Sequence, residues 1–241
     1  MKKYLGFCIL VFILLFSTAV YAGEFEAVGG VTSNNFDSEI TFEPEILLPD
    51  EIVTVELGRL SGYGYYVGGR YIFDNNFGLG IGYDYASAPL NLYGSYEAAQ
   101  ASNNDVNAEL DLGFESELSG PYAEVVYKLN DYITFSGALA WYDFTNTVSA
   151  GLTINDSDII EPGDMVLFKG DGTGYLLGAE LNYPVVDDWN IISNAGYRIA
   201  DIDINEVNTG DFDNDNFQDI DEDVSLKMQG FKFGAGISYQ F

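Results

Sequence analysis

Histidine is absent from all 241 residues of the chain. The imidazole group is the commonest general base near neutral pH and a frequent metal ligand. Its absence excludes the hydrolytic and metal-dependent mechanisms that require it. Pairs of carboxylates can cleave glycosides without histidine, but no cleft for such a reaction is evident in the sequence.

Cysteine occurs once, at Cys8, within an apolar run over 5–16. The run follows two lysines and leads to Val20-Tyr21-Ala22, a pattern that predicts a secretory signal peptide over 1–22, cleaved after Ala22. An uncleaved anchor helix is the alternative, but the run is short for the roughly 30 Å of hydrocarbon in a bilayer. The mature chain, 23–241, would be one domain without cysteine or disulfide.

Basic residues are scarce, since 9 Lys and Arg stand against 38 Asp and Glu, for a formal net charge of -29. Loss of the two lysines in the signal peptide would take the mature chain to -31. Such acidity excludes nucleic acid, or an anionic membrane surface, as an electrostatic partner.

Apolar residues of the mature chain alternate with small or polar residues, most clearly in the C-terminal segment 224–241. A period of two is that of a β-strand. The aromatics cluster near one end and Lys232 lies on the other face, which favours lipid over a soluble core. Every backbone group of a strand in a bilayer must be paired, so the strand must belong to a closed barrel. The apolar set is Phe231, Phe233, Ala235, Ile237, Tyr239 and Phe241.

A terminal strand of this kind behind an export signal resembles the small outer-membrane β-barrel proteins of Gram-negative bacteria, of the OmpA, OmpX and OmpW kind. The resemblance implies an outer-membrane location and insertion by the barrel-assembly machinery. Outer-membrane proteases, phospholipases and lipid A acyl-modifying enzymes rely on a histidine, so the absence of histidine closes their chemistry to this chain. The implied assembly signal consists of Phe233, Ile237, Tyr239 and Phe241.

The same alternation along the chain predicts an all-β fold, an eight-stranded antiparallel up-and-down transmembrane β-barrel. Three short turns, at 74–76, 130–131 and 186–188, alternate with four long loops, which places the turns and both termini in the periplasm. A soluble lipocalin-like barrel is the alternative, but it would expose a face of Gly, Ser, Thr and Asn. The expected strands are 24–32, 62–73, 77–85, 121–129, 133–141, 174–183, 189–199 and 224–241, and the expected loops are 34–59, 86–120, 146–171 and roughly 200–223.

Beyond Ala200 the alternation changes phase, because Ile202 and Ile204 fall on the parity of the polar face. A β-bulge, or a strand that continues beyond the bilayer, would explain this change.

If the aromatic face meets lipid, the other face lines a charge-balanced lumen. A lone charge inside a narrow barrel is costly, so we expect these residues to be paired. Eight strands leave room for little more than side chains, which favours a polar plug that holds the strands in register. A narrow pathway for ions or small solutes is the alternative. The predicted lumen charges are Glu26, Arg70, Asp84, Glu124, Lys128, Glu180, Arg198 and Lys232.

Acids concentrate in the expected loops, most densely over 211–222. Carboxylates at positions 1, 3, 5, 9 and 12 of this window, with a carbonyl at position 7, resemble an EF-hand calcium loop. Asn216 replaces the usual glycine at position 6, and no helices flank the window. A solvated acidic face screened by salt is the alternative, as is weak divalent bridging to lipopolysaccharide. The candidate Ca²⁺ ligands are Asp211, Asp213, Asp215, Phe217, Asp219 and Glu222.

These features predict a monomeric, non-enzymatic outer-membrane barrel, surrounded by lipid and lipopolysaccharide, with acidic external loops and a role in envelope structure or surface interaction. A narrow porin-like channel for small solutes or cations, and an adhesin or receptor acting through the loops, are the alternatives. No cofactor is required by this interpretation, and Ca²⁺ in the fourth loop is the one candidate.

Overall fold

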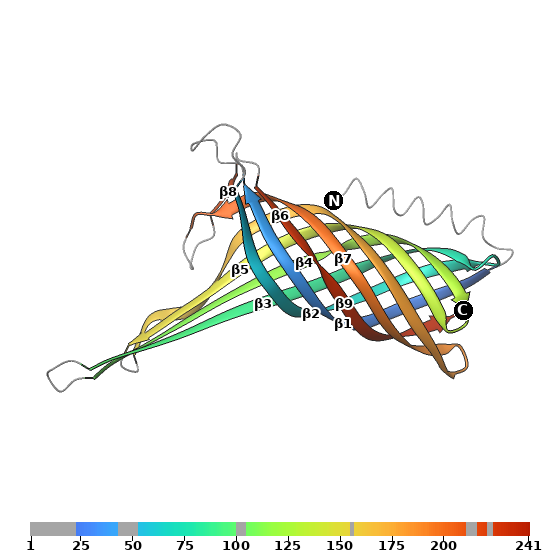
Figure 1. Ribbon diagram of the computed structural model, residues 1–241, viewed down its shortest axis with the longest axis horizontal. Coiled ribbons are helices and arrows are strands. Elements are labelled where there is room, and N and C mark those ends of the chain that lie inside the picture. Colours follow the sequence, from blue (N-terminus) through green and yellow to red (C-terminus); the bar gives the residue numbers. More distant parts are fainter. Residues whose placement is uncertain (1–22, 43–52, 100–104, 155–156, 211–215, 221–223) are drawn as a thin grey trace.

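The computed structural model describes residues 23–42, 53–99, 105–154, 157–210, 216–220 and 224–241 (Figure 1). The expected signal peptide and its cleavage site lie outside these residues. Within the described ranges, no helix is long and apolar enough to cross a membrane. The strands are β1 (Gly23–Phe42), β2 (Val53–Phe73), β3 (Phe77–Ala99), β4 (Asp105–Asn130), β5 (Ile133–Ile154), β6 (Ser157–Val186), β7 (Trp189–Asn208), β8 (Phe217–Asp219) and β9 (Val224–Gln240).

Eight strands close into a ring in which all neighbours are antiparallel. The last strand, β9, pairs with β1 from Glu26↔Gln240 to Phe42↔Val224, and its other edge pairs with β7. The short strand β8 lies outside the ring, on an edge of β7. The predicted eight-stranded antiparallel up-and-down fold is therefore confirmed, with β8 as an additional strand.

The three short turns lie where the sequence predicts them. Asn76 and Asp187 have positive φ angles of 67° and 47°, which Asn and Asp tolerate better than most residues. In the turn between β4 and β5, the side-chain carbonyl of Asn130 accepts hydrogen bonds from the backbone amides of Tyr132 and Ile133, both at 2.9 Å.

Alternate residues of each strand face opposite sides of the ring, one set toward the outside and the other toward the lumen. Rings stack across neighbouring strands on the outer face, as between Tyr65 and Tyr85, whose centroids are 4.9 Å apart. Large apolar side chains on this face are exposed, as expected of a surface that lipid covers. Examples are Tyr63, Val67, Val125, Phe135, Leu177, Ile191, Phe233 and Ile237.

The strands are much longer than the sequence predicts. A transmembrane strand needs roughly 9–11 residues, whereas β6 has 30. Most of the expected loops 34–59, 86–120 and 146–171 are therefore paired strand. The expected strands ended where outward aromatics give way to polar residues such as Asp37 and Asp143, but the hydrogen-bonded ladder continues past that point.

Beyond the ring, the strands separate into two sheets that diverge in Figure 1. Pairing between β2 and β3 stops at Tyr63↔Ser87, and pairing between β6 and β7 stops at Phe168↔Val207. Strands β3 to β6 continue as one sheet, and β2, β1, β9 and β7 continue as the other.

The phase change after Ala200 is not a bulge. Pairing of β7 with β9 is continuous through Ala200↔Met228 and Ile202↔Leu226, and the side chain of Ile202 is fully buried inside the ring. The alternative of a strand continuing beyond the bilayer fits the structure, because the interior itself changes from charged to apolar at this level. The apolar core includes Phe36, Leu60, Leu118, Tyr142, Phe144, Ile202, Ile204, Leu226 and Met228.

A charge on the outer face tests which part of the ring lies in lipid. We expect Val125→Arg to destabilise the folded protein in lipid vesicles by about 2–4 kcal/mol, because Val125 lies on the outer face of the aromatic-lined part. Ser61→Arg, on the outer face beyond Tyr63, should cost at most ~1 kcal/mol. Urea unfolding measures both, and equal losses would contradict the placement of the bilayer.

Candidate functional site in the lumen

Arg70 is the centre of the first charged group in the lumen. It lies on β2 directly opposite Glu26 on β1, and its Nε donates to Glu26 Oε2 at 2.6 Å. Its Nη1 donates to Glu180 Oε2 on β6 at 2.7 Å. Because β6 is not adjacent to β2 in the ring, this bridge crosses the lumen and ties three strands together.

Asp84 on β3 is the centre of the second group. Its Oδ1 accepts from Lys232 Nζ at 2.7 Å, and its Oδ2 accepts from the hydroxyl of Tyr142 at 3.0 Å and from Arg198. The guanidinium carbon of Arg198 also lies 5.4 Å and 5.6 Å from the ring centroids of Phe36 and Tyr142, within the range of cation–π contacts. This group joins the charged layer to the apolar core above it.

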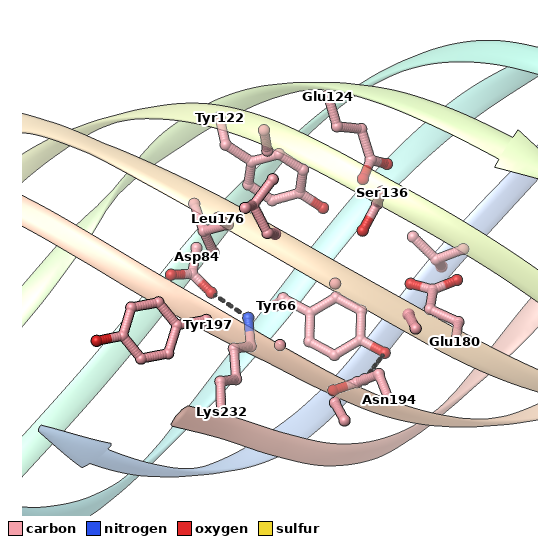
Figure 2. Close-up of a pocket in the computed structure, with 17 residues that line it drawn as sticks. Tyr66, Asp84, Tyr122, Glu124, Ser136, Leu176, Glu180, Asn194, Tyr197 and Lys232 are labelled. Atoms are coloured by element: carbon pink, nitrogen blue, oxygen red, sulfur yellow. Dashed lines mark hydrogen bonds and ion pairs between the residues drawn. The ribbon is translucent and has the colours of Figure 1, made fainter. Parts of the chain in front are cut away.

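A cavity of about 70 Å³ lies between the two groups, and Figure 2 shows the side chains around it. Glu124 on β4 lines it, and this carboxylate has no hydrogen bond or ion pair among the described residues. Glycine on β3 makes room for the bulky side chains of β4. A Cβ at Gly82 would lie 2.4 Å from the ring of Tyr122, and one at Gly80 would lie 2.6 Å from Glu124 Oε1.

An apolar core covers the charged layer on the side of the long strand extensions. Its members include Phe36 and Tyr142, each only 1% exposed. On the side of the short turns, the buried side chains are both apolar (Ile72 and Val126) and polar (Thr134 and Asn182). Large side chains therefore fill much of the lumen in the described residues.

The structure brings together seven of the eight charged residues assigned to the lumen from sequence. The exception is Lys128, which lies at the mouth of the ring beside the short turns, where its Nζ is 3.3 Å from Glu24 Oε2 and the side chains are 15% and 55% exposed. Tyr142 was missed because the expected strand ended at Trp141. The continued alternation past Trp141 is the signal that could have identified it.

Only part of the candidate calcium window lies within the described residues. Asp211, Asp213, Asp215 and Glu222 fall outside them. Phe217 and Asp219 belong to β8, opposite Asn208 and Glu206, and Lys169 Nζ lies 3.3 Å from the Phe217 ring centroid. In the described part of the chain, no three Asp, Glu, His or Cys residues converge to hold a metal ion.

The implied assembly-signal residues lie on the outer face of β9 and at the C-terminus. Phe233, Ile237 and Phe241 are exposed, and Tyr239 packs with its ring centroid 4.9 Å from Trp189 and 4.6 Å from Phe241. The backbone amide of Phe241 donates to the carbonyl of Phe25 at 2.9 Å, so the chain end helps to close the ring.

Comparison with protein families gives one match, because the family model for the outer membrane protein beta-barrel domain matches residues 8–241. No curated protein sequence matches the chain significantly.

Similar solved structures include Ail, the attachment invasion locus protein of Yersinia pestis, at 15% identity and a TM-score of 0.30, with 91% of this chain and 99% of Ail covered. OprG of Pseudomonas aeruginosa has 15% identity and a TM-score of 0.39, with 91% and 96% covered. The outer membrane protease OmpT of Escherichia coli has 9% identity and a TM-score of 0.44, with 90% and 97% covered.

Removal of Arg70 tests the importance of the buried bridge. We expect Arg70→Met to lower the free energy of unfolding by about 3–5 kcal/mol, because Glu26 and Glu180 would remain buried without their partner. Lys128→Met, which breaks only the exposed pair at the mouth, should cost at most ~1 kcal/mol. Adding Glu26→Gln and Glu180→Gln to Arg70→Met should recover most of the loss, and a failure to recover would contradict the electrostatic explanation.

Proposed function

Because the chain belongs to the outer membrane protein β-barrel domain family, we propose that it is a non-conducting integral protein of the outer membrane, whose sealed barrel carries an acidic extracellular surface. The observation that carries this proposal is the filled lumen. Side chains as large as Arg70, Arg198 and Tyr142 are almost completely buried in it. A pore needs a continuous aqueous path, and buried ion pairs next to a packed apolar core argue against one.

The acidic residues on the outer face do not stabilise the sheet, so their presence needs another explanation. Asp143 on β5, Asp171 on β6 and Asp203 on β7 are direct cross-strand neighbours on the outer face beyond the aromatic-lined part, and all three are exposed. Like charges directly opposite each other destabilise a sheet. This row therefore favours a role at the surface, and divalent cations shared with neighbouring lipopolysaccharide are the partners we propose for it.

A non-enzymatic role is supported by the chemistry of the interior. The sequence has no histidine, and Glu26, Asp84 and Glu180 are each held by a cation in the lumen. Carboxylates that are buried and ion-paired in this way are not available as a general acid or base, and Glu124, which has no such partner, stands without a second free carboxylate beside it. The ring also leaves no free strand edge within its aromatic-lined part, which supports a monomer.

Conductance measurements test the sealed lumen. Purified protein in a planar bilayer should show no stable unitary openings, while a porin in the same membrane gives them as a positive control. Stable openings whose ion selectivity changes in Glu124→Gln would instead establish a path through the lumen, and the channel interpretation would replace this one.

Neutralising the acidic row tests the surface role. Asp143→Asn, Asp171→Asn and Asp203→Asn together should raise the free energy of unfolding at low salt by about 1 kcal/mol, and should weaken the Mg²⁺-dependent retention of lipopolysaccharide by the purified protein. The matched control is Asp74→Asn, Asp131→Asn and Asp187→Asn, which removes the same charge at the periplasmic turns. Equal retention in both triple variants would rule out the proposed role of the row.

A further inference from the structure

The separation of the two sheets beyond the ring exposes an edge of β3. Pairing of β2 with β3 stops at Tyr63↔Ser87, whereas β3 continues to Ala99 and stays paired with β4 throughout. In the described part of the chain, no strand lies on the other side of β3 over 88–99, and Figure 1 shows the two sheets diverging there. Backbone N–H and C=O groups on such an edge are a template for one more strand.

The ladder between β3 and β4 determines which backbone groups face the free edge. The amide of Lys128 donates to the carbonyl of Asn76 at 2.8 Å, so even-numbered residues of β3 direct their backbone groups toward β4. The pairing runs to Ala99↔Asp105 without a register shift, so this assignment holds to the end of the strand. Odd-numbered residues therefore direct theirs toward the free edge. The first of them in this stretch is Pro89, which has no N–H, as is typical of an edge.

The other edges that the separation creates are irregular or short. Leu57 of β2 is a bulge, because its neighbours Gly58 and Glu56 pair with consecutive residues of β1. Register shifts interrupt the pairing of β6 with β5 at three places, and β6 also contains Pro162. β7 ends at Asn208, one residue beyond its last pair with β6. Bulges and prolines protect an edge from pairing, so β3 offers the one long, regular edge among the described strands.

Charge selects the kind of strand that this edge accepts. The segment 88–117 contains six Asp and Glu and no Lys or Arg. Glu115 and Glu117 of β4 lie beside the start of the edge, where they accept hydrogen bonds from Ser87 and Tyr85. A second copy of this chain would bring the same acids to the contact, so repulsion opposes self-pairing. A basic segment is attracted instead.

We propose that the free edge of β3 over 88–99 is a docking site for an extended, basic segment of another protein, which adds to the sheet as a further strand. Hydrogen bonds to the backbone of the odd-numbered residues supply the affinity, and the acids of 88–117 select lysine and arginine side chains. Because the edge lies outside the ring, this role goes beyond the proposed function and operates whether or not the lumen conducts.

A synthetic peptide of about ten residues, in which lysine alternates with valine, is the probe, because it matches the length and charge of the edge. Fluorescence anisotropy of the labelled peptide measures its binding to the folded full-length protein in zwitterionic detergent micelles. We expect saturable binding of one peptide per chain that weakens as salt is added. A peptide with glutamate in place of lysine should bind at least about tenfold more weakly.

Two matched variants separate backbone pairing from general attraction to an acidic surface. Asn91→Pro with Ser95→Pro removes two N–H groups from the free edge and leaves the ladder with β4 intact, since these groups do not face β4. Binding of the lysine peptide should weaken at least about tenfold. Asn91→Ala with Ser95→Ala changes the same side chains but keeps the N–H groups, so it should bind as the wild type does. Urea unfolding establishes that both variants are folded.

Disulfide trapping locates the peptide even if the proline variant does not fold. No cysteine follows Cys8, so Asn91→Cys introduces a single thiol into the chain from 23 onward. A lysine peptide carrying one cysteine should cross-link to it at least about fivefold faster than to Asp164→Cys on the irregular edge of β6. Equal rates at the two positions, or equal binding by the proline and alanine variants, would contradict the docking site. Dimers of the wild type that the proline variant abolishes would assign the edge to a second copy and overturn the basic partner.

Discussion

The pairing of β1 with β9 is the interaction on which the rest of the structure depends. Lipid offers no hydrogen-bond partner, so a sheet that crosses it must have no free edge. The ladder from Glu26↔Gln240 to Phe42↔Val224 removes that edge. Once the ring is closed, each strand has one face toward lipid and one toward an enclosed axis. Large apolar residues therefore alternate with small or charged ones, because successive residues of a strand face these two environments in turn.

A ring of eight strands is narrow, and its interior must be filled. The protein fills it in two ways along the axis. Within the aromatic-lined part, charged side chains bridge strands on opposite sides of the lumen, as Arg70 does between Glu26 and Glu180. Further out, apolar side chains form a core similar to that of a soluble β-protein. Ion pairs depend on distance and direction, so the charged layer can also specify the register of the strands.

The sequence alone predicts the ring, its strand number and the side that each residue faces, because a period of two survives in every strand. It does not predict how far the strands extend. At Asp143 and Asp203 the outward residues become acidic, which resembles a loop, although the inward residues Phe144 and Ile204 remain apolar and buried. The isoleucines after Ala200 give the appearance of a phase change for the same reason.

The sequence also does not show which charged residues pair with one another in the lumen. Parity tells which side of the sheet a residue faces, but not its height along the axis. Lys128 has the parity of the lumen and nevertheless lies at the mouth beside Glu24, whereas Arg198 lies deep enough to reach Asp84. Height follows from the stagger between strands, and that stagger appears only when the ring is closed.

The change of interior and the change of exterior occur near the same level of the ring, and this coincidence has a physical reason. Where the outside is lipid, outward residues supply the apolar surface, so the interior is free to be polar. Where the outside is water, apolar burial can occur only inside, and the lumen takes over the role of a hydrophobic core. Asp201 and Asp203 outside, with Ile202 and Ile204 inside, are the inverse of the arrangement around Arg70. A well-packed core in the extension can offset the repulsion among its exposed carboxylates, so the acidic surface is compatible with a stable fold.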